Sequence, residues 1–310
     1  MSQTESPRIV VLGSINMDLV VRCTELPAAG ETVLAETSME FCGGKGANQA
    51  VAASLSGGDV SMIGAVGNDA FADRLRRNLQ QHEINCESVL QRLDFPSGLA
   101  VISVDQHGQN SIMVVSGANG TITSKTVQSA ASMIQQADAL LVQLEIPIDA
   151  VLAGIEIARQ AGVRVLLDPA PAMQQIPADF LAVDLLCPNE SEAAMLTGHT
   201  VQSIDDAVTA AETLHQRGAE NVAITLAERG TLLLSNGQSN LIPAFPIDPV
   251  DSTAAGDAFA GSLAVRWLQS GDLPSAVSFA NAAGALTASK QGAQASMPTQ
   301  NEIDTLWRSR

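Results

Sequence analysis

The run DSTAAGD, residues 251–257, places small residues before a carboxylate at the expected start of a helix. Ala254, Ala255 and Gly256 would let a ligand approach the backbone closely, and the amides of a first helical turn point outward as anion donors. A carboxylate at Asp257 would repel a bound anion. The two features are compatible if the amides hold a transferring phosphoryl group while Asp257 takes a proton from the attacking hydroxyl. An acidic helix start, which the helix dipole favours, is the commoner explanation for such a run taken alone.

A second polar group, Pro188–Glu192, follows an expected strand that ends at Cys187. Ligands of parallel sheets bind at the carboxyl ends of the strands, so these side chains would reach a ligand. Asn189 and Glu192 stand three residues apart and would face the same way, which suits contact with phosphate and with water bound to Mg²⁺. The pattern Asn-x-x-Glu also resembles a helix capping box, which is the commoner explanation when the pattern stands alone.

The stretch FCGGKGANQA, residues 41–50, surrounds a lysine with three glycines. A Walker-type loop needs a glycine where Met39 stands and a hydroxyl residue where Gly46 follows Lys45. The dinucleotide fingerprint fails as well, because Gln49 occupies the place of its third glycine. The spacing therefore excludes both nucleotide loops and leaves the ligand of this stretch open.

Two further carboxylates, Asp18 and Glu145, come shortly after expected strands that end near residues 12 and 142. Strand ends would bring both to the ligand-binding edge of a sheet, although either could be a solvated loop residue. The histidines are scattered along the chain and are interpreted as surface or packing residues: His82, His107, His199 and His215.

The segments that must position these residues alternate between apolar, β-rich runs and helical patterns. Strands are predicted at Arg8–Leu12, Val60–Val66, Ala139–Val142, Val163–Leu167, Asp184–Cys187 and Asn221–Leu226. Helices are predicted at about 46–55, 71–79 (with Asn68 as candidate N-cap), 149–161, 190–197, 203–217, 255–270 and 274–289. This alternation predicts an α/β fold with a Rossmann-like, mostly parallel central sheet covered by helices on both faces.

Two regions break the alternation and predict a small β-sheet lid, built from about 17–42 and 97–117. The first contains the apolar runs Leu19–Val21 and Thr32–Leu34 without a helix signal. The second reads as a β-hairpin around the turn Asp105–Gly108. With neither linker nor internal repeat, residues 1–310 are predicted to form a single domain carrying this small sheet. Its apolar strands also predict a homodimer through the lid.

The overall composition excludes several classes of protein. The chain has 310 residues, 46% of them hydrophobic and 16% charged, which is typical of a globular protein with one large core. Its net charge of −17 argues against nucleic acid as a partner. No apolar run approaches a membrane span, and the polar start MSQTESPR has no apolar signal region. The widely separated cysteines Cys23, Cys42, Cys86 and Cys187 indicate reduced thiols in a cytoplasmic protein.

Taken together, four motifs resemble those of the ribokinase-like sugar kinase family. They are the segment Gly13–Asp18, the GGKGANQA loop, Asn189–Glu192 and DSTAAGD, and they occur in the family's order. The resemblance extends over about residues 8–307. Within the family, Gly43–Asn48 and Ser116–Asn119 look more like the ribose kinases than like the fructose or nucleoside kinases.

The resemblance implies a role for each motif. The glycine-lysine loop would bind a sugar, with the pentose held by Asn16, Asp18, Gly44, Lys45, Asn48 and Glu145. Asp257 would be the catalytic base, and the amides of Ala254, Ala255 and Gly256 would form the anion hole. The nucleotide would lie along Asn189, Thr225, Leu226, Ala227, Glu228, Arg229, Gly230, Gly256 and Asn281. A potassium site would use Asp251, Thr253, Thr287, Lys290, Gly292 and Ser296, and Glu192 would act indirectly on magnesium.

The expected activity is therefore ATP-dependent phosphorylation of D-ribose at its 5-hydroxyl, with Mg²⁺ required and K⁺ activating. A kinase for deoxyribose or another furanose is the alternative within the class, and a non-catalytic sugar-sensing protein is the alternative outside it. Two residues depart from the family's pattern. Ala260 stands where members often carry Asn, which affects helix packing, and Cys42 would make activity sensitive to oxidation if it were exposed.

Overall fold

The computed structural model describes residues 6–173 and 177–310 of the chain. Within these residues, nine strands form the central sheet in the order β13-β12-β11-β10-β9-β8-β1-β4-β5. Their bounds are β1 (Arg8–Leu12), β4 (Asp59–Val66), β5 (Asn85–Gln91), β8 (Ala139–Val142), β9 (Arg164–Leu167), β10 (Leu185–Leu186), β11 (Asn221–Thr225), β12 (Thr231–Ser235) and β13 (Gln238–Ile242). The strands from β11 to β5 pair in parallel, while β12 and β13 are antiparallel additions at one edge. The predicted mostly parallel sheet is confirmed.

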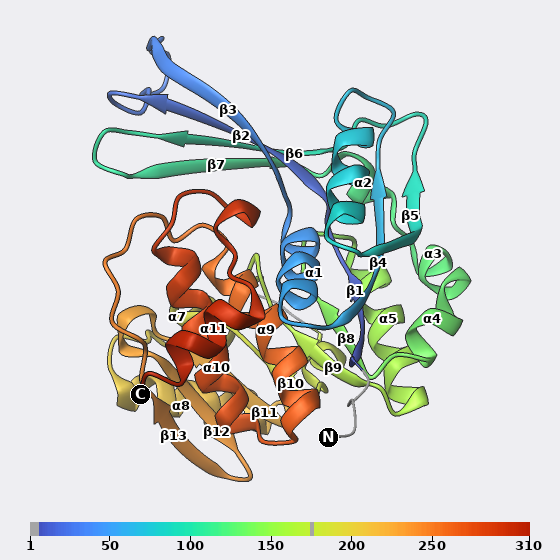
Figure 1. Cartoon of the computed structure of the whole chain (residues 1–310), viewed down its shortest axis with the longest axis vertical. Coiled ribbons are helices and arrows are strands. Elements are labelled where there is room, and N and C mark those ends of the chain that lie inside the picture. Colours follow the sequence, from blue (N-terminus) through green and yellow to red (C-terminus); the bar gives the residue numbers. More distant parts are fainter. Residues whose placement is uncertain (1–5, 174–176) are drawn as a thin grey trace.

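Helices cover both faces of this sheet (Figure 1). They are α1 (Lys45–Leu55), α2 (Ala72–Gln81), α3 (Ser124–Ser129), α4 (Ala131–Gln135), α5 (Ile148–Ala161), α6 (Ala178–Leu181), α7 (Glu190–Thr197), α8 (Ile204–Gln216), α9 (Ala255–Ser270), α10 (Leu273–Ala288) and α11 (Gln300–Trp307). Short 3₁₀ turns lie at η1 (Gly117–Thr121), η2 (Ala227–Arg229) and η3 (Gln294–Ser296).

Strand β1 shows why a buried parallel strand is apolar at every position. Val10 and Leu12 belong to the core under α5 and α8, whereas Ile9 and Val11 belong to the core under α1, α9 and α10. Successive side chains of a strand point to opposite faces, so a strand covered on both faces buries all of them. The carboxyl end of β1 then leads directly into the polar segment that carries Asn16 and Asp18.

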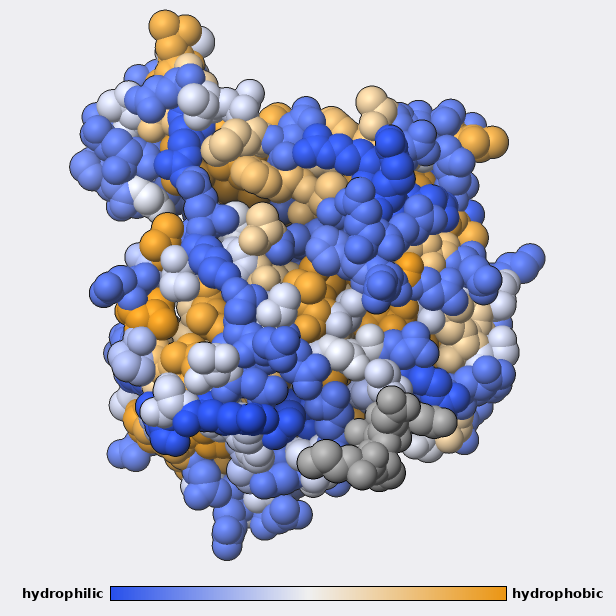
Figure 2. Space-filling model, in the orientation of Figure 1, coloured by the Kyte–Doolittle hydropathy of each residue, from blue (hydrophilic) through white to orange (hydrophobic). Residues whose placement is uncertain are grey.

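A separate small sheet has the strand order β3-β2-β6-β7, with β2 (Asn16–Cys23), β3 (Ala35–Gly43), β6 (Gly98–Val104) and β7 (Asn110–Val115). It extends from the body of the molecule at the top of Figure 1. Strands β2 and β6 are parallel, and β6 and β7 form the predicted hairpin. In Figure 2 this part of the surface carries apolar residues at its tip and along one side, among hydrophilic ones.

Two local predictions were wrong. The run Thr32–Leu34 lies outside any strand, because the pairing of β3 with β2 runs from Gly43 back only to Ala35, where β2 ends. Leu34 is consequently 92% exposed. Asn68 does not cap α2, which begins at Ala72. Instead the Asp69 carboxylate accepts hydrogen bonds from the amides of Phe71 and Ala72, both at 3.1 Å.

In the part of the chain that the structure describes, no helix is long and apolar enough to cross a membrane.

Candidate active site

The Glu145 carboxylate joins three segments at the carboxyl edge of the sheet. Its Oε2 accepts hydrogen bonds from Ser14 Oγ at 2.5 Å, from the Lys45 amide at 3.2 Å and from Asn16 Nδ2 at 3.5 Å. Glu145 follows β8, Ser14 and Asn16 follow β1, and Lys45 opens α1. Glu145 therefore joins two other predicted sugar-binding residues, Asn16 and Lys45. Ser14 was missed, because one serine in a loop carries no pattern.

The glycines of residues 43–46 are required by close packing of α1 against the turn after β1. Gly44 has φ 90°, and a Cβ there would lie 2.7 Å from the Asn16 amide nitrogen. A Cβ at Gly43 would lie 2.0 Å from Asp18 Oδ2, and one at Gly46 would lie 2.6 Å from the amide nitrogen of Ser14. At Gly44 and Gly46 the neighbours are backbone atoms, so only glycine lets the start of α1 lie this close to the turn after β1.

Asp18 lies on β2 and is 7% exposed. Burial raises its pKa to about 7, and the nearby carboxylates Glu145 and Asp257 add to the effect. Its side chain lines a cleft of about 610 Å³ that runs from the small sheet to the segment Asp251–Thr253. The cleft thus connects the predicted sugar-binding carboxylate to the start of α9.

Asp257 is held by two side-chain amides from α1. Its Oδ2 accepts from Asn48 Nδ2 at 2.9 Å, and its Oδ1 accepts from Gln49 Nε2 at 3.2 Å. It is 5% exposed in the first turn of α9, whose N-cap residue is Ala254. The carboxylate is thus fixed by the helix that begins with the glycine-lysine loop. Asn48, predicted as a sugar-binding residue, instead donates to Asp257 in this structure.

The proposed anion hole is open at one of its residues and closed at another. Ala254 has φ 60°, and a Cβ at Gly256 would meet no atom within 4 Å. The backbone at Gly256 is therefore accessible. The amide of Ala255, in contrast, donates to the Ser252 carbonyl at 3.2 Å. An anion would have to compete with that bond for Ala255.

Lys45 and Asp168 form the charged part of the site. Burial acts to lower the pKa of Lys45, but Asp168, Asp257, Glu145 and Glu192 outweigh it and raise the pKa, so the ammonium persists. Burial raises the pKa of Asp168 to about 8 against the opposing effect of Lys45. Asp168 Oδ2 also accepts from Gln49 Nε2 at 2.8 Å. Sequence reasoning missed Asp168, although it follows β9 directly, as Glu145 follows β8.

Asn189 and Glu192 form a reciprocal capping box at the start of α7. Asn189 Oδ1 accepts from the Glu192 amide at 2.9 Å, and Glu192 Oε2 accepts from the Asn189 amide at 2.8 Å. Burial raises the pKa of Glu192, against the opposing effects of Asn189 and Lys45. Among the described residues Glu192 Oε1 has no hydrogen-bond partner. Capping therefore occupies one carboxylate oxygen and leaves the other available.

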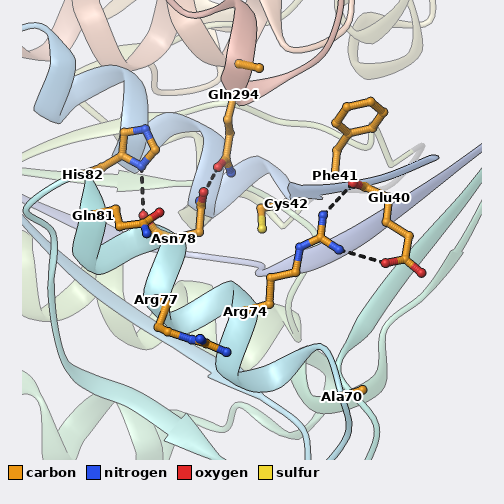
Figure 3. A pocket seen from close by; sticks show the side chains of 11 residues that line it. Glu40, Phe41, Cys42, Ala70, Arg74, Arg77, Asn78, Gln81, His82 and Gln294 are labelled. Atoms are coloured by element: carbon orange, nitrogen blue, oxygen red, sulfur yellow. Dashed lines mark hydrogen bonds and ion pairs between the residues drawn. The ribbon is translucent and has the colours of Figure 1, made fainter.

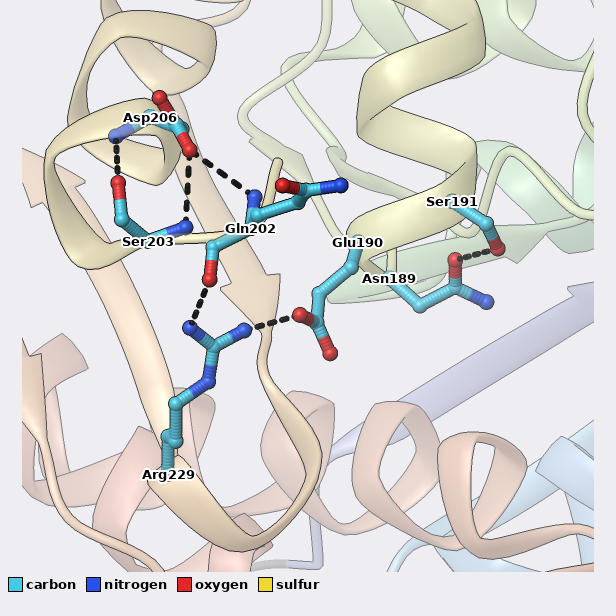
Figure 4. A network of polar contacts seen from close by, with 7 residues as sticks. All are labelled: Asn189, Glu190, Ser191, Gln202, Ser203, Asp206 and Arg229. Atoms are coloured by element: carbon cyan, nitrogen blue, oxygen red, sulfur yellow. Dashed lines mark hydrogen bonds and ion pairs between the residues drawn. The ribbon is translucent and has the colours of Figure 1, made fainter. Parts of the chain in front are cut away.

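The predicted nucleotide segment lies beside this capping box. Thr225 forms a β-bridge with Asn189. Arg229 pairs with Glu190 and donates to the Gln202 carbonyl at 2.9 Å (Figure 4). The segment from Thr225 to Gly230 joins β11 to β12 through η2, which contains Ala227, Glu228 and Arg229 after Leu226.

The side chain of Asn281 is already fully engaged. Its Oδ1 accepts from Thr231 Oγ1 at 2.6 Å, and its Nδ2 donates to the carbonyls of Ile242 and Pro243 at 3.1 and 3.3 Å. In this structure Asn281 anchors the segment after β13, and its predicted contact with a nucleotide would require it to exchange these bonds.

Asp251 joins two loops at the predicted potassium site. Its Oδ1 accepts from the Thr253 amide and its Oδ2 from the Gly292 amide, both at 3.0 Å. Burial acts to raise its pKa, but these hydrogen bonds hold the pKa of Asp251 below its ordinary value. Ser296 is fully buried and donates to the Ala293 carbonyl at 2.7 Å.

Two other predicted ligands are close in sequence to this loop. The Lys290 amide donates to the Thr287 carbonyl at 3.2 Å, while the Lys290 ammonium pairs with Glu302 on the surface. No group of three or more His, Cys, Asp or Glu residues in residues 6–173 and 177–310 is arranged to hold a metal ion. A cation here would therefore depend on backbone carbonyls, with Asp251 as its charged ligand.

Cys42 is half buried at the end of β3. Burial raises the pKa of its thiol, although Arg74 opposes the effect. Since the thiolate is the form that oxidises, the structure gives no support to oxidation sensitivity at Cys42.

Known proteins resemble this chain over most of its length. The model of the "pfkB family carbohydrate kinase" matches residues 6–300. The chain is 38% identical over 296 residues to a ribokinase of Haemophilus influenzae, covering 95% of this chain and 96% of that protein. It is 37% identical over 297 residues to a deoxyribokinase of Salmonella typhi, covering 96% and 97%.

A solved structure of Arabidopsis thaliana ribokinase complexed with ribose and ATP superimposes with a TM-score of 0.90. That protein is 31% identical, with 98% of this chain and 99% of that chain covered.

Proposed function

Because the chain belongs to the pfkB family of carbohydrate kinases, we propose that it is a ribokinase. It transfers the γ-phosphoryl group of ATP to the 5-hydroxyl of D-ribose, giving ribose 5-phosphate and ADP. The observation that carries the proposal is the Asp257 carboxylate. It is buried, held by two amides, and located in the first turn of α9 beside the open backbone of Gly256.

In this proposal, separate residues of the site accept the proton, hold the sugar and stabilise the transferred phosphoryl group. Asp257 accepts the proton of the sugar hydroxyl as the phosphoryl group is transferred. Asn16, Asp18, Gly44, Lys45, Asn48 and Glu145 hold the other parts of the sugar. The first-turn amides of α9 receive the charge of the phosphoryl group, with Gly256 the most accessible of them.

Both proposed metal ions suit the donors that are present. A potassium ion fits the ionised Asp251 together with the carbonyls of Thr253, Thr287, Lys290 and Gly292, because hard cations prefer oxygen ligands. A magnesium ion would be held through a water molecule bound to Oε1 of Glu192, the carboxylate oxygen without a hydrogen-bond partner among the described residues. When bound, the ion would neutralise negative charge on the phosphate groups.

The choice between ribose and deoxyribose depends on one hydroxyl. The ribokinase and the deoxyribokinase are 38% and 37% identical to the chain, so identity alone does not separate them. Ribose is favoured by the loop Gly43–Asn48 and by the similarity to a ribokinase solved with ribose and ATP. The separate, unpaired cysteines are compatible with action in the cytoplasm.

A coupled assay of ADP release with ribose, 2-deoxyribose, fructose and xylose tests the substrate. We expect kcat/KM for ribose to exceed the others by at least about 10-fold, the value of one buried hydrogen bond. Equal or better turnover of deoxyribose would assign the chain to the alternative substrate. Sugar binding without any turnover would support the non-catalytic sensor instead.

Replacing Asp257 by Asn tests the base. The substitution keeps size and shape, so we expect kcat to fall by roughly 10²–10⁴ while calorimetric affinity for ribose changes little. The matched variant Asp18→Ala should chiefly raise KM, by roughly 10-fold or more. Near-normal turnover of Asp257→Asn would reduce Asp257 to a structural residue and refute the mechanism.

A further inference from the structure

Three side-chain amides connect helix α2 to Asp257. Asn78 Nδ2 donates to Gln294 Oε1 at 2.6 Å, and Gln294 Nε2 donates to Asn48 Oδ1 at 2.9 Å. Asn48 Nδ2 then donates to Asp257 Oδ2 at 2.9 Å. The four residues come from α2, η3, α1 and α9, so the chain crosses four elements that are far apart in sequence.

The direction of this chain is fixed by the charge at its end. An ionised carboxylate can only accept hydrogen bonds, so Asn48 must turn its NH₂ group toward Asp257. Its carbonyl oxygen then faces Gln294, which must in turn offer its own NH₂ group. The same argument requires Asn78 to donate to Gln294. Every amide therefore points its donor toward Asp257, and the aligned dipoles reinforce one another.

The chain is shielded along most of its length and reaches the surface at one end. Asp257 and Asn48 are each 5% exposed, and Gln294 is 8% exposed. Asn78 and Gln294 line a hollow of about 760 Å³ between α2, β3 and the segment after Gly292 (Figure 3). Arg74, also in its wall, is paired with Glu40. The chain therefore meets solvent at its Asn78 end, and Asn78 or Gln294 can be substituted without changing Asp257 itself.

We propose that Gln294 and Asn78 are positioning residues for Asp257, holding Asn48 in the orientation that keeps the carboxylate ionised and aimed at the sugar hydroxyl. The inference rests on the proposed function of Asp257 as base. It extends the site to two residues that touch neither sugar nor nucleotide, the farther of which lies three hydrogen bonds from the base.

Other charged groups also act on Asp257, and the test must leave them unchanged. Lys45 on α1 faces it, as do Asp18 on β2, Asp168 after β9 and Glu192 on α7. A second donor, Gln49 Nε2, remains on Oδ1 whatever happens to the chain. Breaking the chain should therefore impair catalysis at low pH, where less of the carboxylate is ionised, without abolishing it.

The sharpest test reverses the chain from its surface end. In Asn78→Asp the new carboxylate can only accept, so Gln294 would turn its NH₂ group outward and Asn48 would turn its carbonyl toward Asp257. An oxygen facing the carboxylate favours its protonated form. The acidic limb of the kcat–pH profile should move up by about 0.5–1 unit, which is about a 3–10-fold loss of kcat at low pH. The loss should vanish on the alkaline plateau.

Two matched variants separate this effect from its alternatives. Asn78→Leu removes the donor but cannot reverse the chain. The acidic limb of its kcat–pH profile should therefore move by less than half of the shift expected for Asn78→Asp. Gln81→Glu adds the same charge to the same hollow outside the chain, and its profile should match the wild type. Gln294→Glu should move the limb in the same direction as Asn78→Asp. If Asn78→Asp shows a lowered unfolding temperature, Gln294→Glu provides an independent variant in which the chain is reversed.

The outcomes distinguish the proposals. If Asn78→Asp and Gln294→Glu lower kcat by one factor at every pH, the chain is merely structural and the inference is wrong. Equal shifts in Asn78→Asp and Gln81→Glu would show a field effect and would also overturn it. Asp257→Asn, measured in parallel, tests the base independently: if it abolishes turnover while the chain variants behave like wild type, the proposed function stands and only this inference fails.

Discussion

At the scale of single residues, Asp18 is a carboxylate whose burial is unfavourable. Its carboxylate is buried near those of Glu145 and Asp257, and no other described residue donates a hydrogen bond to it. A buried carboxylate without hydrogen-bond donors is unfavourable in its ionised form, and the hydroxyls of a sugar would supply such donors. The burial of Asp18 is thus unfavourable in the free protein, and a bound sugar would offset it by donating hydrogen bonds.

Replacing Asp18 by Asn should therefore stabilise the free protein in a pH-dependent way. The folded pKa is raised from 3.8 to about 7, so the folded state binds more protons than the unfolded state between these values. Wild-type stability should fall as pH rises through this window. Asp18→Asn should be more stable by about 2–4 kcal/mol at pH 8 and equal to wild type below pH 4. Denaturant unfolding at both pH values measures this, and an unchanged difference between them would contradict it.

At the scale of secondary-structure elements, the turn after β1 and the start of α1 depend on one backbone conformation. Gly44 combines a positive φ with a Cβ position that the Asn16 backbone already occupies. Gly162, which ends α5, has φ 71° but no atom within 4 Å of its Cβ position. A substitution at Gly162 therefore tests backbone strain alone, whereas one at Gly44 tests strain together with steric overlap.

Gly44→Ala should cost more than Gly162→Ala for this reason. We expect Gly162→Ala to destabilise by about 1–2 kcal/mol through strain alone. Gly44→Ala should lose at least about 2–3 kcal/mol and raise the KM for the sugar, because Asn16 must move. Unfolding and steady-state kinetics measure both effects. Equal losses of stability with an unchanged KM would show that α1 adapts without disturbing the site.

The loops joined by Asp251 form the predicted potassium site, so we expect activity to depend on the monovalent cation. Potassium should activate far better than sodium, because the ion would support the turn that leads into α9. Asp251→Ala should lower kcat and remove the difference between the two salts, whereas Asp248→Ala, an exposed carboxylate in the same segment, should leave it intact. Turnover at matched ionic strength in potassium and sodium chloride tests this. Equal rates in wild type would argue against the site.

The elements also show what the sequence could predict. Strands such as β1 and β8 were predicted because burial on both faces makes every residue apolar. Strand β13 was missed, since most of its residues are exposed and follow no pattern. Glu145 and Asp257 were predicted as site residues from strand ends and family motifs. Gln49, Asp168 and Gln294 were missed because their contacts join distant segments, and one glutamine in a helix looks like any other.

At the scale of the whole molecule, the small sheet leaves apolar surface uncovered. Every residue of β7 is exposed, and β7 pairs only with β6, so its outer edge has unpaired backbone groups. Ile112, Met113, Val114 and Val115 are between 50% and 62% exposed. Exposed apolar edge strands aggregate unless they are covered. A second copy of the chain, packed on the same surface, would cover apolar side chains of this strand.

We therefore propose a homodimer through the small sheet and expect light scattering at micromolar concentration to give twice the monomer mass. Ile112→Asp should convert the protein to a monomer, because a charge would be buried against the partner's apolar strand. Leu241→Asp is the matched control: it introduces the same charge at an exposed position of β13, at the edge of the central sheet, and should leave the dimer intact. A monomeric wild type would refute the proposal. Dissociation by both variants would assign the effect to net charge, since the chain already carries −17. If the dimer persists in Ile112→Asp and dissociates only in Leu241→Asp, the interface belongs to β13, and the apolar surface of β7 must have another explanation.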